Sequence, residues 1–163
     1  MAQLTRDLFI PCLDTNKGSG TANWVPIDLS TQFEFSYNPT TDTKSYICNK
    51  NDNTVVSGYA PEFPQEIALT SGNDMHDFMD EFLNSYPVGA DANIPLLIVR
   101  PDKSTGKPTV GQMWSDCIVV GDTLNTVDGI LSFTIHPNGD PTDGTVAITG
   151  TGDSKKITFT PKA

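Results

Sequence analysis

The longest periodic stretch of the chain lies within residues 61–86, where hydrophobic positions follow the spacing of a helix rather than that of a strand. From Met75 they recur every three or four residues, which places them on one helix face. Ser71 or Asn73 supplies the N-cap, and Pro87 ends the helix because it lacks an amide hydrogen. The residues expected to pack this helix against a β-core are Met75, Phe78, Met79, Phe82 and Leu83.

The rest of the chain alternates between short hydrophobic runs and turn sequences, a pattern typical of β-proteins. Residues 32–37 alternate strictly, with Phe33, Phe35 and Tyr37 on one face and Glu34 on the other. Further strands are expected over residues 24–29, 44–49, 54–59, 63–69, 94–100, 110–120, 129–136, 146–148 and 157–159. The pattern therefore predicts a mainly β fold, a sandwich or barrel of two sheets, flanked by one α-helix.

Residues 38–58 form a polar excursion between two of these strands. The excursion begins with turn residues over 38–42 and has a second polar tip over 50–53. Its few hydrophobic side chains give it little to bury against its own domain, and loops of this length are usually functional or disordered. We expect it to be a long protruding loop.

Length and composition favour a single domain over residues 1–163 with many turns. The chain has 12 prolines and 13 glycines, and its hydrophobic fraction of 37% is low for a compact globule. Residues 1–20 show no clear period, so we expect either an N-terminal arm that packs on a neighbour or a frayed terminus.

The formal net charge of −10 opposes electrostatic binding to nucleic acids or anionic membranes. Eight acidic residues lie between Lys50 and Arg100, a stretch without a single Lys or Arg. This surplus serves either solubility or a surface that repels another polyanion. No membrane partner is expected, because the longest aliphatic run, residues 94–99, is too short to span a bilayer.

No catalytic motif appears in the sequence, which has neither a nucleophile elbow nor a phosphate-binding glycine loop. Its cysteines are Cys12, Cys48 and Cys117, too widely spaced for a zinc site and odd in number, as in a reduced compartment. His76 and Asp80 have the spacing of two metal ligands on a helix, although a solvent-facing histidine is commoner. Residues 138–144 resemble a calcium loop in composition but not in spacing. We expect no enzyme, metal or cofactor.

Several segments occur in an order that resembles the major tail proteins, or tail tube proteins, of long-tailed bacteriophages of the siphophage type. The matching segments, all within residues 20–163, are Trp24–Asp28, Phe33–Pro39, Tyr46–Ile47, Gly58–Pro61, Ile94–Val99, Ile135–Pro141 and Gly144–Thr145. The resemblance implies a β-sandwich or barrel with one helix. It also implies assembly into stacked hexameric rings that form the hollow tail tube through which DNA passes.

The resemblance also assigns roles to parts of the chain. Residues 38–58 match a loop that reaches the adjacent ring or subunit, and residues 1–20 fit an arm. The tube lumen of this family is acidic, so DNA passes without sticking, and Glu34 is the candidate lumen acid. The residues implied for the inter-ring loop are Asn38, Thr41, Asp42, Lys44, Lys50, Asn51, Asp52 and Asn53.

The implied partners are copies of the same chain, a tape measure protein, and tail-terminator or distal-tail proteins. Double-stranded DNA would be present only in transit. The expected location is the virion, and the host cytoplasm before assembly. One alternative is the tube protein of a contractile phage-tail-like or type VI secretion machine. A second is a carbohydrate-binding or adhesin β-sandwich with Trp24, Trp114 or Tyr59 as a sugar platform, and a hydrolase is a distant third.

Overall fold

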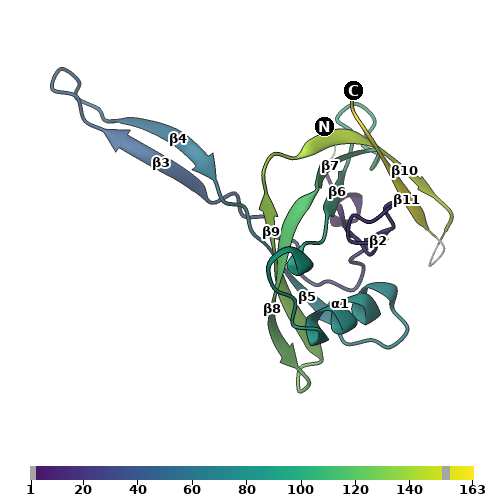
Figure 1. The fold of residues 1–163 in the computed structure, drawn as a ribbon. Coiled ribbons are helices and arrows are strands. Elements are labelled where there is room, and N and C mark those ends of the chain that lie inside the picture. The colour runs from purple at the N-terminus through teal and green to yellow at the C-terminus, as the bar shows by residue number, and fades with distance from the viewer. Residues whose placement is uncertain (1–2, 152–154) are drawn as a thin grey trace.

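The computed structural model describes residues 3–151 and 155–163, which form a closed barrel, a three-stranded sheet and a two-stranded hairpin (Figure 1). The strands are β1 (Ile10–Asp14), β2 (Trp24–Pro26), β3 (Pro39–Lys44), β4 (Asn53–Tyr59), β5 (Phe63–Ala68), β6 (Leu96–Arg100), β7 (Val110–Trp114), β8 (Asp116–Asn125), β9 (Ile130–Asn138), β10 (Thr142–Thr149) and β11 (Lys156–Pro161). The helices are α1 (Asp74–Asn84) and the 3₁₀ turns η1 (Arg6–Leu8) and η2 (Gly89–Ala92). The predicted class, mainly β with one flanking α-helix, is confirmed.

The barrel has the strand order β1-β2-β11-β10-β7-β6, and β6 forms a wall between two hydrophobic clusters. Leu97 and Val99 pack in the barrel cluster, whereas Leu96 and Ile98 pack in the cluster beneath α1. Successive side chains of a strand point to opposite faces, so a strand buried on both sides must be hydrophobic at every position. This explains the unbroken hydrophobic run that the sequence shows there.

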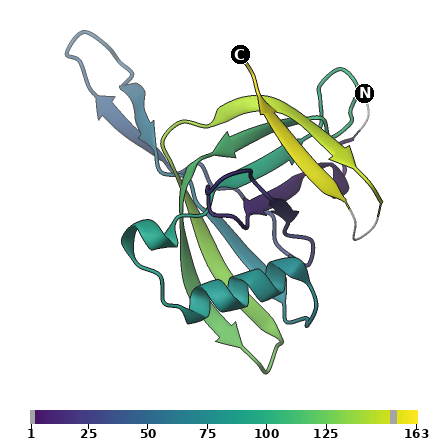
Figure 2. The same cartoon turned by 45° about the vertical axis from the view of Figure 1, so that its right-hand side comes forward.

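The larger cluster lies between α1 and the sheet β5-β9-β8, which Figure 2 shows side by side. Met75, Met79 and Phe82 are buried, and Phe78 and Leu83 are partly buried against the cluster. Phe63 of β5 and Phe133 of β9 are fully buried on the sheet side. The helical spacing of the hydrophobic residues thus follows from one helix face covering one sheet face.

The ends of α1 have identifiable causes. The Asn73 side chain accepts a hydrogen bond from the His76 amide at 3.0 Å, so Asn73 rather than Ser71 is the N-cap. At the other end Ser85 is the C-cap, and Tyr86 adopts a left-handed conformation with φ of 51° before Pro87. A left-handed residue followed by proline stops the helix.

The strand expected over residues 32–37 is wrong, because this segment makes only an isolated bridge between Ser36 and Glu62. Its alternation reflects side-chain packing instead. The Phe33 and Phe35 rings lie 4.9 and 5.8 Å from the Phe63 ring, whereas Tyr37 remains 57% exposed. Alternate aromatic side chains therefore reach the core without a continuous ladder of backbone hydrogen bonds.

The hairpin strands differ in position from those expected. We predicted a turn over 38–42 and a strand over 44–49, but β3 covers Pro39–Lys44 and the turn covers residues 45–52. The threonines of β3 explain the difference, since β-branched residues favour extended backbone and Thr43 Oγ1 lies 3.1 Å from Thr54 Oγ1 across the pair.

A single strand expected over residues 110–120 is in fact two strands in different sheets. The chain leaves the barrel after β7, bends at Ser115 and continues as β8 beside β9. The expected end at residue 120 is also wrong, because β8 runs to Asn125 with a bulge between Gly121 and Thr123. A bulge lets a strand bend without ending it.

The middle of the expected N-terminal arm is a strand of the barrel wall. Strand β1 pairs with β2 and β6, and Cys12 and Leu13 are fully buried. The expected arm or frayed terminus is therefore wrong for residues 10–14, because β1 closes the barrel by pairing with β2 and β6.

Gly144 in β10 provides a test of the barrel packing. A Cβ atom at this position would overlap the Thr160 carbonyl oxygen and lie 2.6 Å from the Phe159 ring. We expect Gly144→Ala to lower the free energy of unfolding by about 1–3 kcal/mol, because β11 must shift to make room. Gly58→Ala in β4 is the matched control, since no atom lies within 4 Å of its Cβ. Urea denaturation of both variants measures the difference, and equal stabilities would contradict this packing.

Candidate assembly surface

The hairpin β3–β4 projects from the body of the molecule (Figure 1). At its base the Asn38 side-chain amide and backbone carbonyl are both bonded to Ala60, each at 3.2 Å. One step closer to the body, Ser36 and Glu62 exchange two backbone hydrogen bonds of 2.9 and 3.0 Å. These paired contacts fix the direction in which the hairpin leaves the body.

The hairpin carries hydrophobic side chains that the described part of the chain leaves about half or more exposed. Val55 is 62% exposed and Val56 is 49% exposed, and the two point to opposite faces of β4. Tyr59 at the base is 65% exposed, and in the turn Tyr46 and Ile47 are 52% and 105% exposed. A protruding element with exposed hydrophobic residues on both faces is typical of a segment that becomes buried against another molecule.

All the residues that the sequence assigned to the protruding loop are exposed on this hairpin. Asn38 lies at the base, Lys50, Asn51 and Asp52 lie in the turn, and the others lie in the strands. The Ser45 hydroxyl donates a hydrogen bond to the Asp52 carboxylate across the turn. The hairpin residues assigned in the strands are Thr41, Asp42, Lys44 and Asn53.

A second exposed feature, which the sequence did not reveal, is the free edge of β8. This strand pairs with β9 on one side, and among the described residues its other side makes one isolated bridge, from Ile118 to Asn93. Val120 and Leu124 are 44% and 58% exposed, and Val127 in the following turn is 92% exposed. An unpaired strand edge can accept a strand from another chain. This edge could not be predicted, because the break at Ser115 between β7 and β8 does not show in the hydrophobic pattern.

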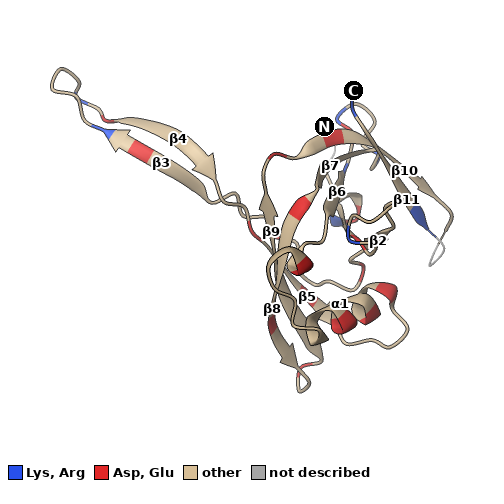
Figure 3. Ribbon diagram, in the orientation of Figure 1, with Lys and Arg blue, Asp and Glu red and all other residues tan. Residues whose placement is uncertain are grey.

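Four acidic residues and no basic residue lie on α1, as Figure 3 shows by colour. Asp74, Asp77 and Glu81 are exposed and Asp80 is half-buried. Glu34, the candidate lumen acid, is also exposed, on the segment that leads to the hairpin. Its role in a lumen stays a prediction.

The described residues contain no group of three or more His, Cys, Asp or Glu side chains that could hold a metal ion. His76 Nδ1 lies 3.3 Å from Asp77, its neighbour in the chain, and His136 Nδ1 lies 4.0 Å from Glu62. None of the helices in the part of the chain that the structure describes is long and hydrophobic enough to cross a membrane.

The sugar platform considered for the adhesin alternative is wrong for both tryptophans. Trp24 and Trp114 are only 7% and 4% exposed, since Trp24 packs in the barrel and Trp114 against Phe35 beneath the helix. Tyr59 is exposed, but it lies on the hairpin and both tryptophans are buried elsewhere.

The cysteines differ in accessibility, and the exposed one lies in the turn of the hairpin. Burial strongly raises the pKa of the Cys12 thiol, and burial followed by the charge of Asp116 raises the pKa of Cys117 to about 12. Cys48 is exposed in the hairpin turn. At pH 8 we therefore expect a thiol reagent to label one cysteine in the folded chain, and Cys48→Ser to slow labelling at least ~10-fold. All three thiols should react in denaturant, and fast labelling of folded Cys48→Ser would contradict the burial of the other two.

No protein-family model matches the chain, and no curated protein sequence matches it. Solved structures do show the same fold. The sheath/tube terminator of the extracellular contractile injection system PVC, in its extended state, has a TM-score of 0.54 and 8% identity, covering 88% of this chain and 97% of that chain. The tube-terminating cap of the anti-feeding prophage has a TM-score of 0.50 and 14% identity, covering 89% and 93%.

A third similar structure comes from the PVC sheath–tube complex in the extended state. Its TM-score is 0.50 and its identity 9%, covering 88% of this chain and 93% of that chain. At identities this low the likeness concerns the fold. The chain thus shares, over almost its whole length, a fold that occurs in components of contractile injection systems.

Proposed function

We propose that this protein is a non-enzymatic structural subunit of a phage-tail-like particle, in which copies of the chain form rings that stack into a tube. The observation that carries the proposal is the β3–β4 hairpin, whose hydrophobic residues are exposed on both faces and projected away from the body. Such a hairpin becomes buried when a neighbouring copy receives it. The shared fold with tube-associated proteins of contractile injection systems supports the same role.

In its finer form the proposal is the tail tube of a siphophage, with six copies in each ring and DNA passing through the lumen. Exposed acids such as Glu34 and a net charge of −10 would keep DNA from binding the wall. The partners would be the tape measure protein and the tail-terminator or distal-tail proteins. The subunit would occur in the host cytoplasm before assembly and in the virion afterwards.

A second candidate function is tube termination, because two of the similar structures are named as a terminator and a terminating cap. A terminator would close the end of a tube as one ring and would not stack with further copies of itself. A tube subunit of a contractile machine is the related alternative, and association of purified tubes with a sheath protein would favour it.

Electron microscopy of concentrated purified protein tests the proposal. Tubes of variable length support the tube subunit, and single closed rings support the terminator. A strictly monomeric protein, both alone and after addition of tail initiator complexes, would contradict both functions.

A further inference from the structure

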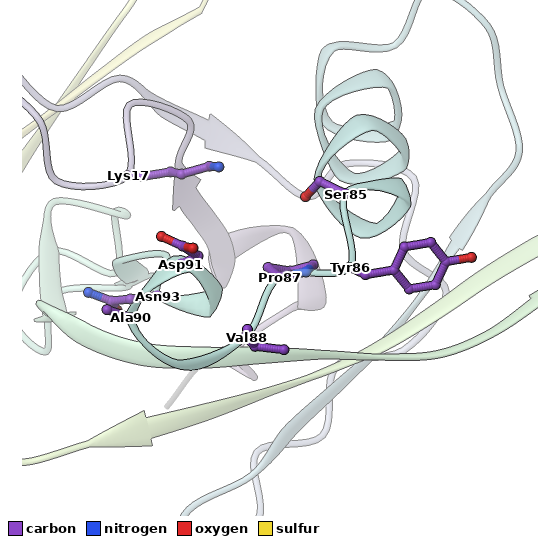
Figure 4. A pocket seen from close by; sticks show the side chains of 8 residues that line it. All are labelled: Lys17, Ser85, Tyr86, Pro87, Val88, Ala90, Asp91 and Asn93. Carbon is purple, nitrogen blue, oxygen red and sulfur yellow. The ribbon is translucent and has the colours of Figure 1, made fainter.

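A pocket of about 450 Å³ lies at the C-terminal end of α1, between the segment that follows the helix and the loop that carries Lys17 (Figure 4). In the view of Figure 4 the Lys17 side chain lies above Asp91, and Ser85 lies above Pro87. The remaining lining residues are Tyr86, Val88, Ala90 and Asn93.

The backbone around this pocket is held in an uncommon conformation at two places. The described chain has three non-glycine residues with positive φ, and two of them, Lys17 at 53° and Tyr86 at 51°, line the pocket. Left-handed backbone is unfavourable for long and bulky side chains and tends to persist where function requires it. The Tyr86 side chain is 85% exposed, so packing within the chain does not explain why a tyrosine occupies this position.

The pocket offers one positive and one negative group, and neither has an oppositely charged partner among the described residues. Lys17 Nζ lies 4.9 Å from the centre of the Phe82 ring, which holds the ammonium at the pocket wall. Asp91 is exposed on η2. Val88 adds a hydrophobic side chain to the lining and is 77% exposed. The pocket is therefore suited to a segment with a hydrophobic side chain and one charge of each sign.

The turn of the hairpin, residues 45–52, has this combination. Ile47 is 105% exposed and is the most exposed of the large hydrophobic residues described. Lys50 and Asp52 follow it within five residues and are both exposed. In Figures 1 and 2 the turn lies far from α1, so the hairpin of the same chain does not occupy the pocket.

We infer that the pocket at the end of α1 receives the hairpin turn of a second copy of the chain, an inference that rests on the proposed function. Ile47 contacts Pro87, Val88 and Ala90. Lys50 pairs with Asp91, and the Asp52 carboxylate faces Lys17. Because turn and pocket lie on different parts of the molecule, the contact can repeat head to tail from copy to copy, as rings or stacks require.

Cys48 provides a direct test, because it lies in the turn and is the exposed cysteine of the described chain. We expect assembled Val88→Cys protein to form a ladder of disulfide-linked copies on mild oxidation, since the new thiol lies on the rim of the pocket. The double variant Val88→Cys/Cys48→Ser should give no ladder. Lys103→Cys, at an exposed site in the turn between β6 and β7, is the matched control and should not give one either.

A charge exchange tests the same contact without oxidation. We expect Asp91→Lys to weaken assembly at least ~10-fold in critical concentration through like-charge repulsion with Lys50, and Asp91→Lys/Lys50→Glu to restore it. Circular dichroism of the soluble subunit checks that both variants fold. If wild-type protein assembles but the exchange has no effect and Val88→Cys gives no ladder, the pocket is not the receiving site, although the proposed function stands. If wild-type protein does not assemble even after addition of tail initiator complexes, both inferences fail.

Discussion

Removing residues 40–56 and joining Pro39 to Ser57 through two glycines is expected to abolish ring and tube formation while leaving a folded monomer. The removed residues are exposed throughout and contribute nothing to either hydrophobic cluster. The bonds between Ser36 and Glu62 remain and anchor the shortened connection. The free energy of unfolding should change by less than about 1 kcal/mol, as for surface changes away from the core.

Assembly is measured by analytical ultracentrifugation and electron microscopy, and stability by urea denaturation. A matched pair of point variants tests whether assembly is lost because a contact is removed or because the hairpin is shortened. Ile47→Ser removes an exposed hydrophobic side chain from the hairpin turn, whereas Lys103→Ser shortens an exposed side chain in the turn between β6 and β7. The first should weaken assembly and the second should not. Tubes formed by the shortened chain would show that the hairpin has no role in assembly.

The largest expected loss of stability comes from Asp14, a carboxylate that is 1% exposed. Its Oδ1 atom accepts hydrogen bonds from the amides of Asn16 and Asn23, and its Oδ2 atom accepts one from Gly18, all at 2.9 Å. These bonds close the loop between β1 and β2. Asp14→Ala leaves three amide donors without a partner and should cost about 3 kcal/mol or more, since each unmet donor costs about 1–3 kcal/mol.

Asp14→Asn refines this prediction. An asparagine oxygen can keep the bonds from Asn16 and Asn23, but its amide group would face the Gly18 amide as a second donor. We therefore expect a loss of stability smaller than that of Asp14→Ala, measured by urea denaturation. Asp42→Ala in the exposed strand β3 is the control and should change stability by less than about 0.5 kcal/mol. Equal stabilities of all three variants would show that the loop closes without this carboxylate.

The same loop links stability to assembly. The bonds made by Asp14 position Lys17, whose backbone amide donates to the Asp14 carbonyl oxygen at 3.0 Å. A variant that loosens the loop should therefore lose the inferred contact at the pocket before it unfolds.

The features that could be predicted from the sequence are those whose signals are local. The helix follows from hydrophobic spacing within a dozen residues, and its cap from a single asparagine. The projecting hairpin follows from a polar stretch that lacks residues to bury. The break at Ser115 could not be predicted, because β7 and β8 together form one hydrophobic stretch whose two halves are distinguished only by the sheets that they join.

Features that depend on contacts between residues distant in the sequence could not be predicted. The alternation over residues 32–37 is that of a strand, but whether a ladder forms depends on how closely the segment follows the edge of β5. The pocket at the end of α1 combines Lys17 with residues 85–93, which are distant in sequence and become neighbours only when the barrel and the helix pack together. Neither contact follows from residue type or spacing.

Strand β6 has a consequence for how the molecule unfolds. Its side chains belong alternately to the barrel and to the cluster beneath the helix, so neither cluster can open without exposing residues of the other. Barrel and helix should therefore melt in one cooperative transition rather than as separate units. In native-state hydrogen exchange the amides of Leu97 and Ile98 should be among the slowest of the chain, exchanging only through global unfolding.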